Sequence, residues 1–153
     1  MNVAGILRGT SRPEEAIVIS AHWDHFGIGE TENGDSIYNG AVDNGTSMAW
    51  ALEIGEAFSS MKKRPERSVI LFFPTAEEQG LLGSSWFVSN PPVAPENLIA
   101  CFNNDLLLPL GRMKDIMVTG YGQSELDDLL ADRQTQPGAA GAPAARAVDL
   151  VEG

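Results

Sequence analysis

The sequence predicts an α/β fold in which helices pack on a mixed β-sheet, and three observations lead to this expectation. Short apolar stretches rich in β-branched residues recur along the chain, as in the strands of a sheet. Between them lie longer stretches whose apolar residues follow the spacing of an amphipathic helix. Residues 68–73 are apolar on both faces, which is typical of a central strand covered on both sides. Strands that alternate with helices in this way indicate a layered sheet.

The first two predicted strands are residues 3–7 and 16–21. A polar turn containing Pro13 separates them, so they are interpreted as a β-hairpin whose second strand is buried, and this hairpin makes the sheet mixed. Residues 26–41 are rich in Gly, Asn and acidic residues and predict a loop. Because this loop is too long for a simple connection, we expect it to be functional.

A helix is predicted over residues 46–62. Its apolar residues recur at intervals of three and four, so one side of the helix packs inward. Oxygen-bearing side chains around its first turn favour this start, and Pro65 ends it. The inward-facing residues are Met48, Ala51, Leu52, Gly55 and Phe58.

The remaining predicted elements are a helix over 79–88, strands over 98–102 and 116–119, and a helix over 124–133. From Gln136 to Ala147 the composition shifts to Ala, Gly and Pro, a low-complexity sequence that predicts no regular structure. We therefore expect a compact domain over residues 1–134, cut short at its C-terminal end, and a low-complexity tail over residues 135–153.

The composition disfavours several classes of function. The chain has 10 Lys and Arg against 21 Asp and Glu, and its formal net charge of −11 disfavours binding to nucleic acid or to an anionic membrane surface. Its apolar runs are too short to span a membrane, and no signal peptide is visible. The single cysteine, Cys101, excludes an internal disulfide and a cysteine-based zinc site, and it is interpreted as a small core residue.

Polar side chains follow three of the predicted strands, at the point where each strand ends. Ligands of open α/β sheets bind beyond the carboxyl ends of the strands, so we expect these side chains to converge at one edge. One imidazole with several carboxylates is a suitable ligand set for divalent metals, zinc included. The residues are His22 and Asp24, then Glu77 and Glu78, then Asp105, and Asp43 at the start of the helix can join them.

Four segments together resemble the co-catalytic zinc aminopeptidase family, which includes bacterial leucyl-type aminopeptidases and relatives of glutamate carboxypeptidase. The segments are IVISAHWDHFG (17–27), YNGAVDNGTS (38–47), FPTAEEQGLLGS (73–84) and NND (103–105). They occur in the family's order, and the match spans about residues 2–105. The resemblance implies a three-layer α/β/α fold with a mixed, mostly parallel sheet. Residues 1–134 would then be part of a metallopeptidase catalytic domain.

The resemblance also implies a role for each residue of the cluster and a cis peptide between Asp43 and Asn44. His22 and Asp105 would bind the first zinc ion, Asp43 would bridge two zinc ions and Glu78 would bind the second, while Glu77 would be the general base and Asp24 would orient the His22 ring. The implied reaction is removal of an N-terminal residue from a peptide substrate by activated water. The family suggests secretion or a periplasmic location.

The chain departs from the family in its histidines. The family's second metal has a histidine ligand on a later segment, whereas the two histidines here are His22 and His25. His25, three residues from His22, is expected on the side of the first metal and is interpreted as a loop residue near the site. The resulting hypothesis is a complete first metal site and an incomplete second one. Alternatives are a catalytically silent homologue or fragment serving as an interaction module, a glutaminyl cyclase-like acyltransferase, and a carboxypeptidase.

Overall fold

The computed structural model describes residues 1–108, Gly111 and Thr119, and its centre is a four-stranded sheet. The strands are β1 (Val3–Leu7), β2 (Arg12–Ser20), β5 (Arg67–Phe73) and β6 (Leu98–Asn103), in the order β1-β5-β2-β6. β2 runs parallel to both β5 and β6, and β1 runs antiparallel to β5. The predicted mixed, mostly parallel sheet is therefore confirmed.

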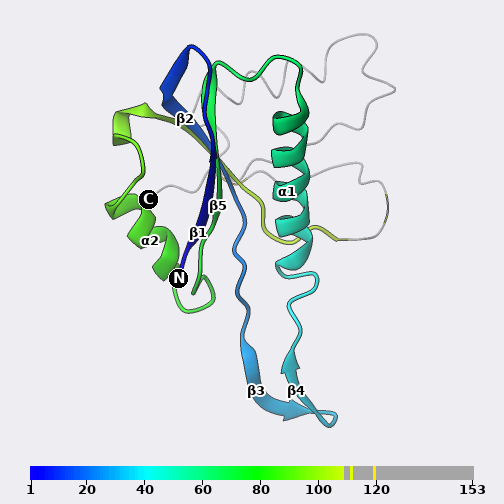
Figure 1. Ribbon diagram of the computed structural model, residues 1–153. Helices are drawn as coiled ribbons and strands as arrows, with labels where there is room; N and C mark the ends of the chain where they lie inside the picture. The colour runs from blue at the N-terminus through cyan, green and yellow to red at the C-terminus, as the bar shows by residue number, and fades with distance from the viewer. Residues whose placement is uncertain (109–110, 112–118, 120–153) are drawn as a thin grey trace.

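Two α-helices among the described residues cover opposite faces of this sheet (Figure 1). They are α1 (Gly45–Ser60) and α2 (Leu82–Ser89). Because successive side chains of a strand point to opposite faces, β2 and β5 contribute to two separate core clusters. On the α1 side the buried residues are Ile19, Ala51, Val69 and Phe73, and on the α2 side they are Ala16, Val18, Ile70 and Phe72. This arrangement is the expected three-layer α/β/α fold.

Both helices pack closely against the sheet. The ring of Phe87 on α2 lies 4.1 Å from the ring of Phe72, measured between centroids. On the other face, a Cβ atom on Gly55 of α1 would lie 2.5 Å from Cδ1 of Leu71. Glycine at this position allows the helix backbone to approach β5 closely.

The prediction that residues 3–7 and 16–21 form a hairpin is wrong. β1 forms no ladder with β2, because β5 lies between them and pairs with both, with Val69 opposite Leu7 of β1 and Ile17 of β2. The local alternation and the polar turn identify two strands without identifying their partners. A strand that is apolar on both faces is most stable at the centre of the sheet, and β5 occupies that position.

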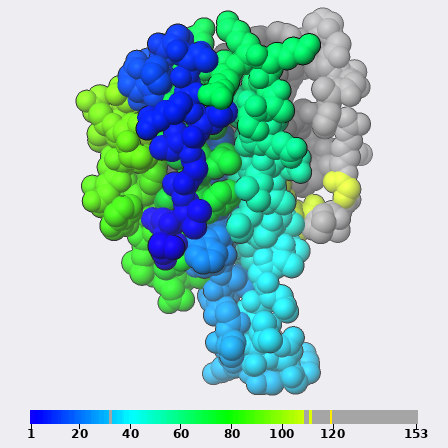
Figure 2. Space-filling model, in the orientation of Figure 1, coloured from blue at the N-terminus to red at the C-terminus, as the bar shows by residue number. Residues whose placement is uncertain are grey.

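The predicted loop over residues 26–41 contains a second, two-stranded sheet. β3 (Gly27–Glu32) pairs with β4 (Asp35–Tyr38) through Asn33 and Gly34, whose φ angles are +50° and +89°. An Asn-Gly pair with two positive φ angles is the preferred two-residue hairpin connection, so the sequence contained a signal for this hairpin. The hairpin extends away from the body of the molecule (Figure 2).

The other boundaries shift by a few residues or lie outside the described part. The short helix begins at Leu82 instead of residue 79, because residues 77–81 form a turn in which Gly80 and Leu81 both donate to the carbonyl of Glu77. A 3₁₀ turn, Pro95–Asn97, precedes β6. The expected helix 124–133, the tail 135–153 and all of strand 116–119 except Thr119 lie outside the described residues. Within the described residues, no helix has the length and apolar character needed to cross a membrane.

We predict that Ile70→Ala destabilises the fold strongly and that Ile28→Ala does not. Ile70 is fully buried in the central strand, so truncation leaves a cavity and costs about 2–5 kcal/mol of unfolding free energy. Ile28 on the hairpin is 80% exposed, and its truncation changes stability by less than about 0.5 kcal/mol. Urea denaturation followed by circular dichroism measures both. Equal losses for the two variants would contradict the placement of the core.

Candidate metal centre

The strand register brings two of the candidate ligands to the same level of the sheet. Ser20 pairs with Asn103, so His22 and Asp105 both follow their strands by two residues. Hydrogen bonds between neighbouring segments continue beyond the strand ends. Trp23 N–H donates to the carbonyl of Pro74, and Asn104 N–H donates to the carbonyl of Ser20. His22 is thereby held beyond the carboxyl end of β2, where the sequence predicted it.

The His22 ring lies between a main-chain carbonyl and two carboxylates. Its side chain is 3% exposed, and Nδ1 lies 3.0 Å from the main-chain oxygen of Asp24. Nε2 lies 3.2 Å from Oδ1 of Asp43 and 3.3 Å from Oδ1 of Asp105. A ring that donates from Nδ1 to a carbonyl presents Nε2 to the two carboxylates. Since carboxylate oxygens are acceptors, a proton or a metal ion must lie between them and Nε2.

The carboxylates around His22 also set its pKa. Burial by itself lowers the pKa of the imidazole, but the hydrogen bonds to Asp105 and to the Asp24 carbonyl, with the negative charges of Asp105 and Glu77, raise the pKa from 6.5 to about 9. The ring therefore carries a proton at neutral pH in the metal-free protein. A metal ion at Nε2 would replace that proton.

Asp43 provides independent support for a cation at this point. Its Oδ1 atom is buried and has no hydrogen-bond partner among the described residues. A buried acceptor without a partner is costly and calls for an explanation such as a bound ion. One ligand atom from each of His22, Asp43 and Asp105 lies within 4.8 Å of the others. This set of one imidazole and two carboxylates fits a zinc ion.

Asp43 also belongs to a second group, together with His25 and Glu78, whose ligand atoms again lie within 4.8 Å of one another. Nδ1 of His25 lies 2.6 Å from Oε1 of Glu78. The expectation that His25 lies on the side of the first metal is therefore wrong, because its side chain turns toward Glu78. Sequence spacing could not show this, since the direction of a side chain in a loop depends on its tertiary neighbours.

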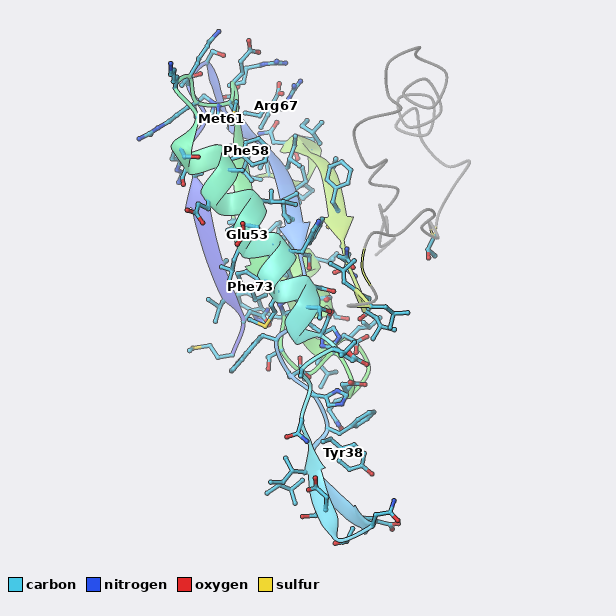
Figure 3. All side chains as sticks on the ribbon, turned by 90° about the vertical axis from the view of Figure 1, so that its right-hand side faces the viewer. Tyr38, Glu53, Phe58, Met61, Arg67 and Phe73 are labelled. Atoms are coloured by element: carbon cyan, nitrogen blue, oxygen red, sulfur yellow. The ribbon has the colours of Figure 1, made fainter. Side chains whose placement is uncertain are left out.

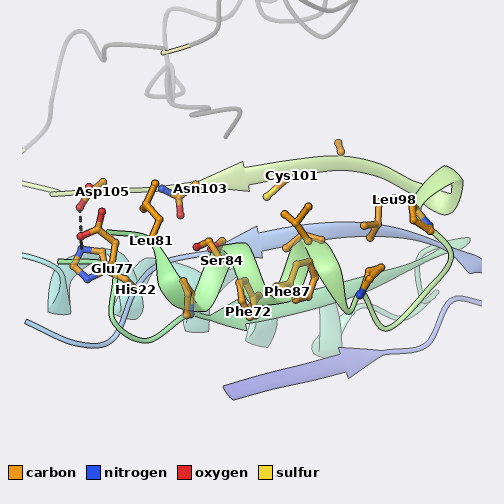
Figure 4. Close-up of a pocket in the computed structure, with 17 residues that line it drawn as sticks. His22, Phe72, Glu77, Leu81, Ser84, Phe87, Leu98, Cys101, Asn103 and Asp105 are labelled. Carbon is orange, nitrogen blue, oxygen red and sulfur yellow. Dashed lines mark hydrogen bonds and ion pairs between the residues drawn. The ribbon is translucent and has the colours of Figure 1, made fainter. Parts of the chain in front are cut away.

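Glu77 lies beside the first group and follows β5 through a strained turn. Its Oε2 atom is 4.0 Å from Nε2 of His22 (Figure 4). Ala76, directly before the turn, and Leu81, its last residue, both have positive φ angles, +57° and +60°. Such backbone strain is common at functional sites. Burial raises the pKa of Glu77; the His22 charge opposes this rise, while Asp105, Glu78 and Asp24 add to it. A raised carboxyl pKa suits a general base that works near neutral pH.

The contact of Asp24 with the His22 ring differs from the one expected. The ring meets the main-chain oxygen of Asp24, whereas the nearest carboxylate oxygen lies 3.9 Å from Nδ1. The Asp24 carboxylate instead accepts the Glu77 N–H, at 3.0 Å to Oδ2 and 3.3 Å to Oδ1. One residue thus positions both the imidazole and the turn that holds the candidate base.

A buried amide network, not anticipated from the sequence, connects the start of α1 to the segment after β6. The Asn44 side chain donates to the carbonyl of Asn104 at 3.1 Å and accepts the N–H of Leu106 at 3.1 Å. The Ser47 hydroxyl donates to the side-chain oxygen of Asn104 at 3.2 Å. These contacts hold Asp43 and Asp105 next to each other. The peptide between Asp43 and Asn44 is cis, as the resemblance implied.

A second set of contacts, also not anticipated from the sequence, holds the Glu77–Glu78 turn. Asn2 donates to the carbonyl of Gly83 at 2.8 Å and accepts the N–H of Thr75 at 3.0 Å. Gly83 packs so closely that a Cβ atom there would lie 2.3 Å from the carbonyl oxygen of Thr75. The N-terminal segment therefore supports the turn although it is distant in sequence.

An apolar groove of about 270 Å³ extends from the candidate metal centre between α2 and β6 (Figure 4). Phe72, Phe87 and Leu98 line its apolar part, while His22, Glu77 and Asp105 stand at one end. Cys101 also lines the groove, and burial raises its thiol pKa to about 11. The thiol is therefore protonated near neutral pH and is a poor nucleophile.

The sequence comparisons agree on one family. The sequence model of "Peptidase family M28" matches residues 2–149. The chain is 29% identical over 106 residues to a probable zinc metalloprotease of Pyricularia oryzae, with 69% of this chain and 20% of that protein covered. It is 30% identical over 108 residues to a probable glutamate carboxypeptidase of Arabidopsis thaliana, with 68% and 14% covered. Bovine carboxypeptidase Q is 29% identical over 112 residues, with 72% and 22% covered. The chain thus spans less than a quarter of each relative.

Solved structures share the fold. A zinc aminopeptidase from Bacillus subtilis superposes with a TM-score of 0.65 at 22% identity, covering 99% of this chain and 34% of that one. A glutaminyl cyclase from Bacteroides thetaiotaomicron bound to N-acetylhistamine has a TM-score of 0.62 at 22% identity, with 85% and 49% covered. At these identities the likeness concerns the fold alone.

We predict that His22 of the metal-free protein titrates near pH 9, where the raised pKa places it. Because the folded-state pKa exceeds the ordinary value of 6.5, the charged ring contributes stability below pH 6.5, and this contribution is lost as the pH rises through 9. Histidine NMR titration, with His25→Gln for assignment, measures the midpoint. Asp105→Asn should lower the midpoint, and an unchanged one would contradict the assigned contact.

We also predict that Gly83→Ala destabilises the protein, whereas Gly5→Ala does not. Alanine is preferred over glycine within a helix by about 0.5–1 kcal/mol, so a loss of stability would reflect the collision with Thr75. A Cβ atom on Gly5 in β1 meets no atom within 4 Å. Thermal unfolding compares the two variants. A Gly83→Ala variant of unchanged or higher stability would disprove the close packing of Gly83 against Thr75.

Proposed function

The chain belongs to peptidase family M28, the zinc metallopeptidases, and on this premise we propose that the cluster around His22 is the catalytic centre of a zinc-dependent aminopeptidase. The observation that supports this most directly is the first ligand group, His22, Asp43 and Asp105, with its unpartnered Asp43 oxygen and with Glu77 beside it. The sheet edge thus combines a cation site and a carboxylate base of raised pKa.

The proposed division of labour follows from the positions of the side chains. His22, Asp43 and Asp105 would hold one zinc ion, and Asp43 with Glu78 would contribute to a second. When bound, zinc would act as a Lewis acid that polarises a peptide carbonyl and makes water more acidic. Three protein ligands leave a zinc coordination position open, as catalytic sites require.

Glu77 would move the proton. Its carboxylate accepts a proton from water while the water oxygen bonds to the carbonyl carbon of the substrate. Glu77 then delivers that proton to the amine nitrogen as the carbon–nitrogen bond breaks, so the free carboxyl and amine products balance the water consumed. Asp24 holds the Glu77 N–H and thereby keeps the base beside His22.

The distribution of charge favours a substrate with a free α-amino group. Among residues 1–108, the lysines and arginines lie at or near the end of the sheet opposite the cluster. Arg12 and Arg67 begin β2 and β5, where they pair with Glu66 and Glu15. Figure 3 shows Arg67 and Met61 at that end, with Phe73 toward the other. A terminal carboxylate would need a cation beside the cluster, whereas an ammonium group is attracted by carboxylates. Within the part of the chain that the structure describes, this contrast supports an aminopeptidase over a carboxypeptidase.

Two alternatives are less well supported. A silent interaction module has no need for a carboxylate base of raised pKa beside a candidate metal site. A glutaminyl cyclase shares the fold, but the presence of Asp43 in both ligand groups favours a two-metal peptidase.

We predict that the chain with added zinc releases p-nitroaniline from aminoacyl-p-nitroanilides and that Glu77→Gln lowers the rate by about 10²–10⁴-fold. Zinc affinity, measured by calorimetry, should change little, because Glu77 belongs to neither ligand group. N-acetylation of the substrate should abolish release if the α-amino group is recognised. Zinc-dependent cleavage at C-terminal residues alone would point to a carboxypeptidase, and no cleavage at either end would support the silent module.

A further inference from the structure

The segment between β2 and α1 contains three Asn-Gly dipeptides, at residues 33–34, 39–40 and 44–45. Asparagine is a chemically labile residue, and a following glycine favours its deamidation because no Cβ atom hinders attack by the glycine nitrogen. The sequence makes the three dipeptides equivalent, but the fold places them in different surroundings. We infer that Asn33 is a site of covalent modification by spontaneous deamidation in the folded protein, whereas the fold protects Asn44.

The reaction consumes water and releases ammonia. The backbone nitrogen of Gly34 loses its proton to a solvent base and bonds to Cγ of Asn33, while the side-chain nitrogen takes up a proton and leaves as ammonia. The product is a succinimide ring that joins the two residues. Water then opens the ring at either of its carbonyl groups, which gives aspartate or isoaspartate. A carboxylate thus replaces the amide, and the chain becomes more negative.

The fold leaves the Asn33–Gly34 dipeptide open to this reaction. The dipeptide connects β3 to β4 in the hairpin that extends away from the body of the molecule (Figure 2). Both residues are exposed, and a Cβ atom on Gly34 would meet no atom within 4 Å. Among the described residues, no hydrogen bond restrains the Asn33 side chain. An isolated two-stranded hairpin is marginally stable, so its connection can open while the main sheet stays folded.

The fold blocks the same reaction at Asn44–Gly45. Asn44 is 2% exposed, its Nδ2 atom donates to the carbonyl of Asn104, and its Oδ1 atom accepts the N–H of Leu106. The attacking atom would be the nitrogen of Gly45, whose N–H donates to the carbonyl of Gly40 at 3.0 Å. These contacts hold the side chain and the attacking nitrogen in place and keep solvent base away. Only an opened form of the protein can therefore react at Asn44.

The Asn39–Gly40 dipeptide is intermediate between these extremes. Asn39 is exposed, but its Nδ2 atom donates to the carbonyl of Ile37 at 3.3 Å. Gly40 packs against the body of the protein, since a Cβ atom there would lie 3.0 Å from Cβ of His25. We therefore expect deamidation of the folded chain to be fastest at Asn33, slower at Asn39 and slowest at Asn44.

The consequences of deamidation also differ between the two extremes. In the hairpin connection, a new carboxylate would repel the nearby Asp35, and isoaspartate would lengthen the main chain of a connection that requires two residues. At Asn44, deamidation would remove the donor that joins the start of α1 to the segment after β6. The fold thus exposes a dipeptide whose change affects the hairpin and buries the one whose change would disturb Asp43 and Asp105.

The test is the rate of deamidation at each asparagine in the 153-residue chain, incubated at physiological temperature and mildly alkaline pH. Tandem mass spectrometry of proteolytic fragments locates each conversion, and circular dichroism checks that the chain stays folded. Asn33 should react in the folded chain at a rate within a few-fold of its rate in urea. Asn44 should react more slowly in the folded chain than in urea by on the order of 100-fold or more.

Asn33→Ser is the matched control, because it removes the reactive amide at an exposed position. It should abolish the fast conversion and leave the rates at Asn39 and Asn44 unchanged. If Asn33 stays intact in the folded chain but reacts in urea, or if Asn44 reacts in the folded chain as fast as Asn33, the inference is wrong. Neither result depends on zinc binding or on peptide cleavage, so the proposed function is tested separately.

Discussion

The parallel alignment of β2 with both of its neighbours is the constraint on which the rest of the site depends. Parallel strands end at the same edge of a sheet, so the polar residues that follow β2, β5 and β6 must meet there. The pairing of Ser20 with Asn103 then puts His22 and Asp105 at equal distances from their strands. A shift of one residue in this register would turn side chains to the opposite face and separate the candidate ligands.

The sheet alone brings the segments together, and buried polar contacts then set the geometry. Asn44 joins the start of α1 to the segment after β6, and Asn2 clamps the turn after β5. Both use amide side chains, which donate and accept at once and can therefore make two backbone contacts each. Because the Asn44 amide is buried, loss of one of its partners would be costly, so this contact also rigidifies the site. Precise placement of ligands requires such support around them.

The concentration of carboxylates at one end of the sheet works against folding without cations. Like charges repel, and the unpartnered Asp43 oxygen adds a desolvation cost. At the opposite end, Arg12 and Arg67 form ion pairs with Glu66 and Glu15. One end of the described sheet therefore has paired charges, and the other end carries the carboxylates of the candidate metal centre. Local conflict of this kind is expected where a sequence is selected for activity as well as for stability.

The sequence by itself predicted the strands and helices of the main described sheet and a set of candidate metal-binding residues. Apolar runs identified the strands of the described sheet, and the positions of His22, Asp43, Glu77, Glu78 and Asp105 at element ends indicated a metal cluster. Only the tertiary structure decided which strands pair and where the loop side chains point. It placed β5 between β1 and β2, turned His25 toward Glu78, and engaged the Asp24 carboxylate with the Glu77 backbone. The physical reason is the distance along the chain over which each effect acts. Periodicity and turn chemistry depend on a few neighbouring residues. Strand partners and side-chain directions depend on contacts between segments that are distant in the chain.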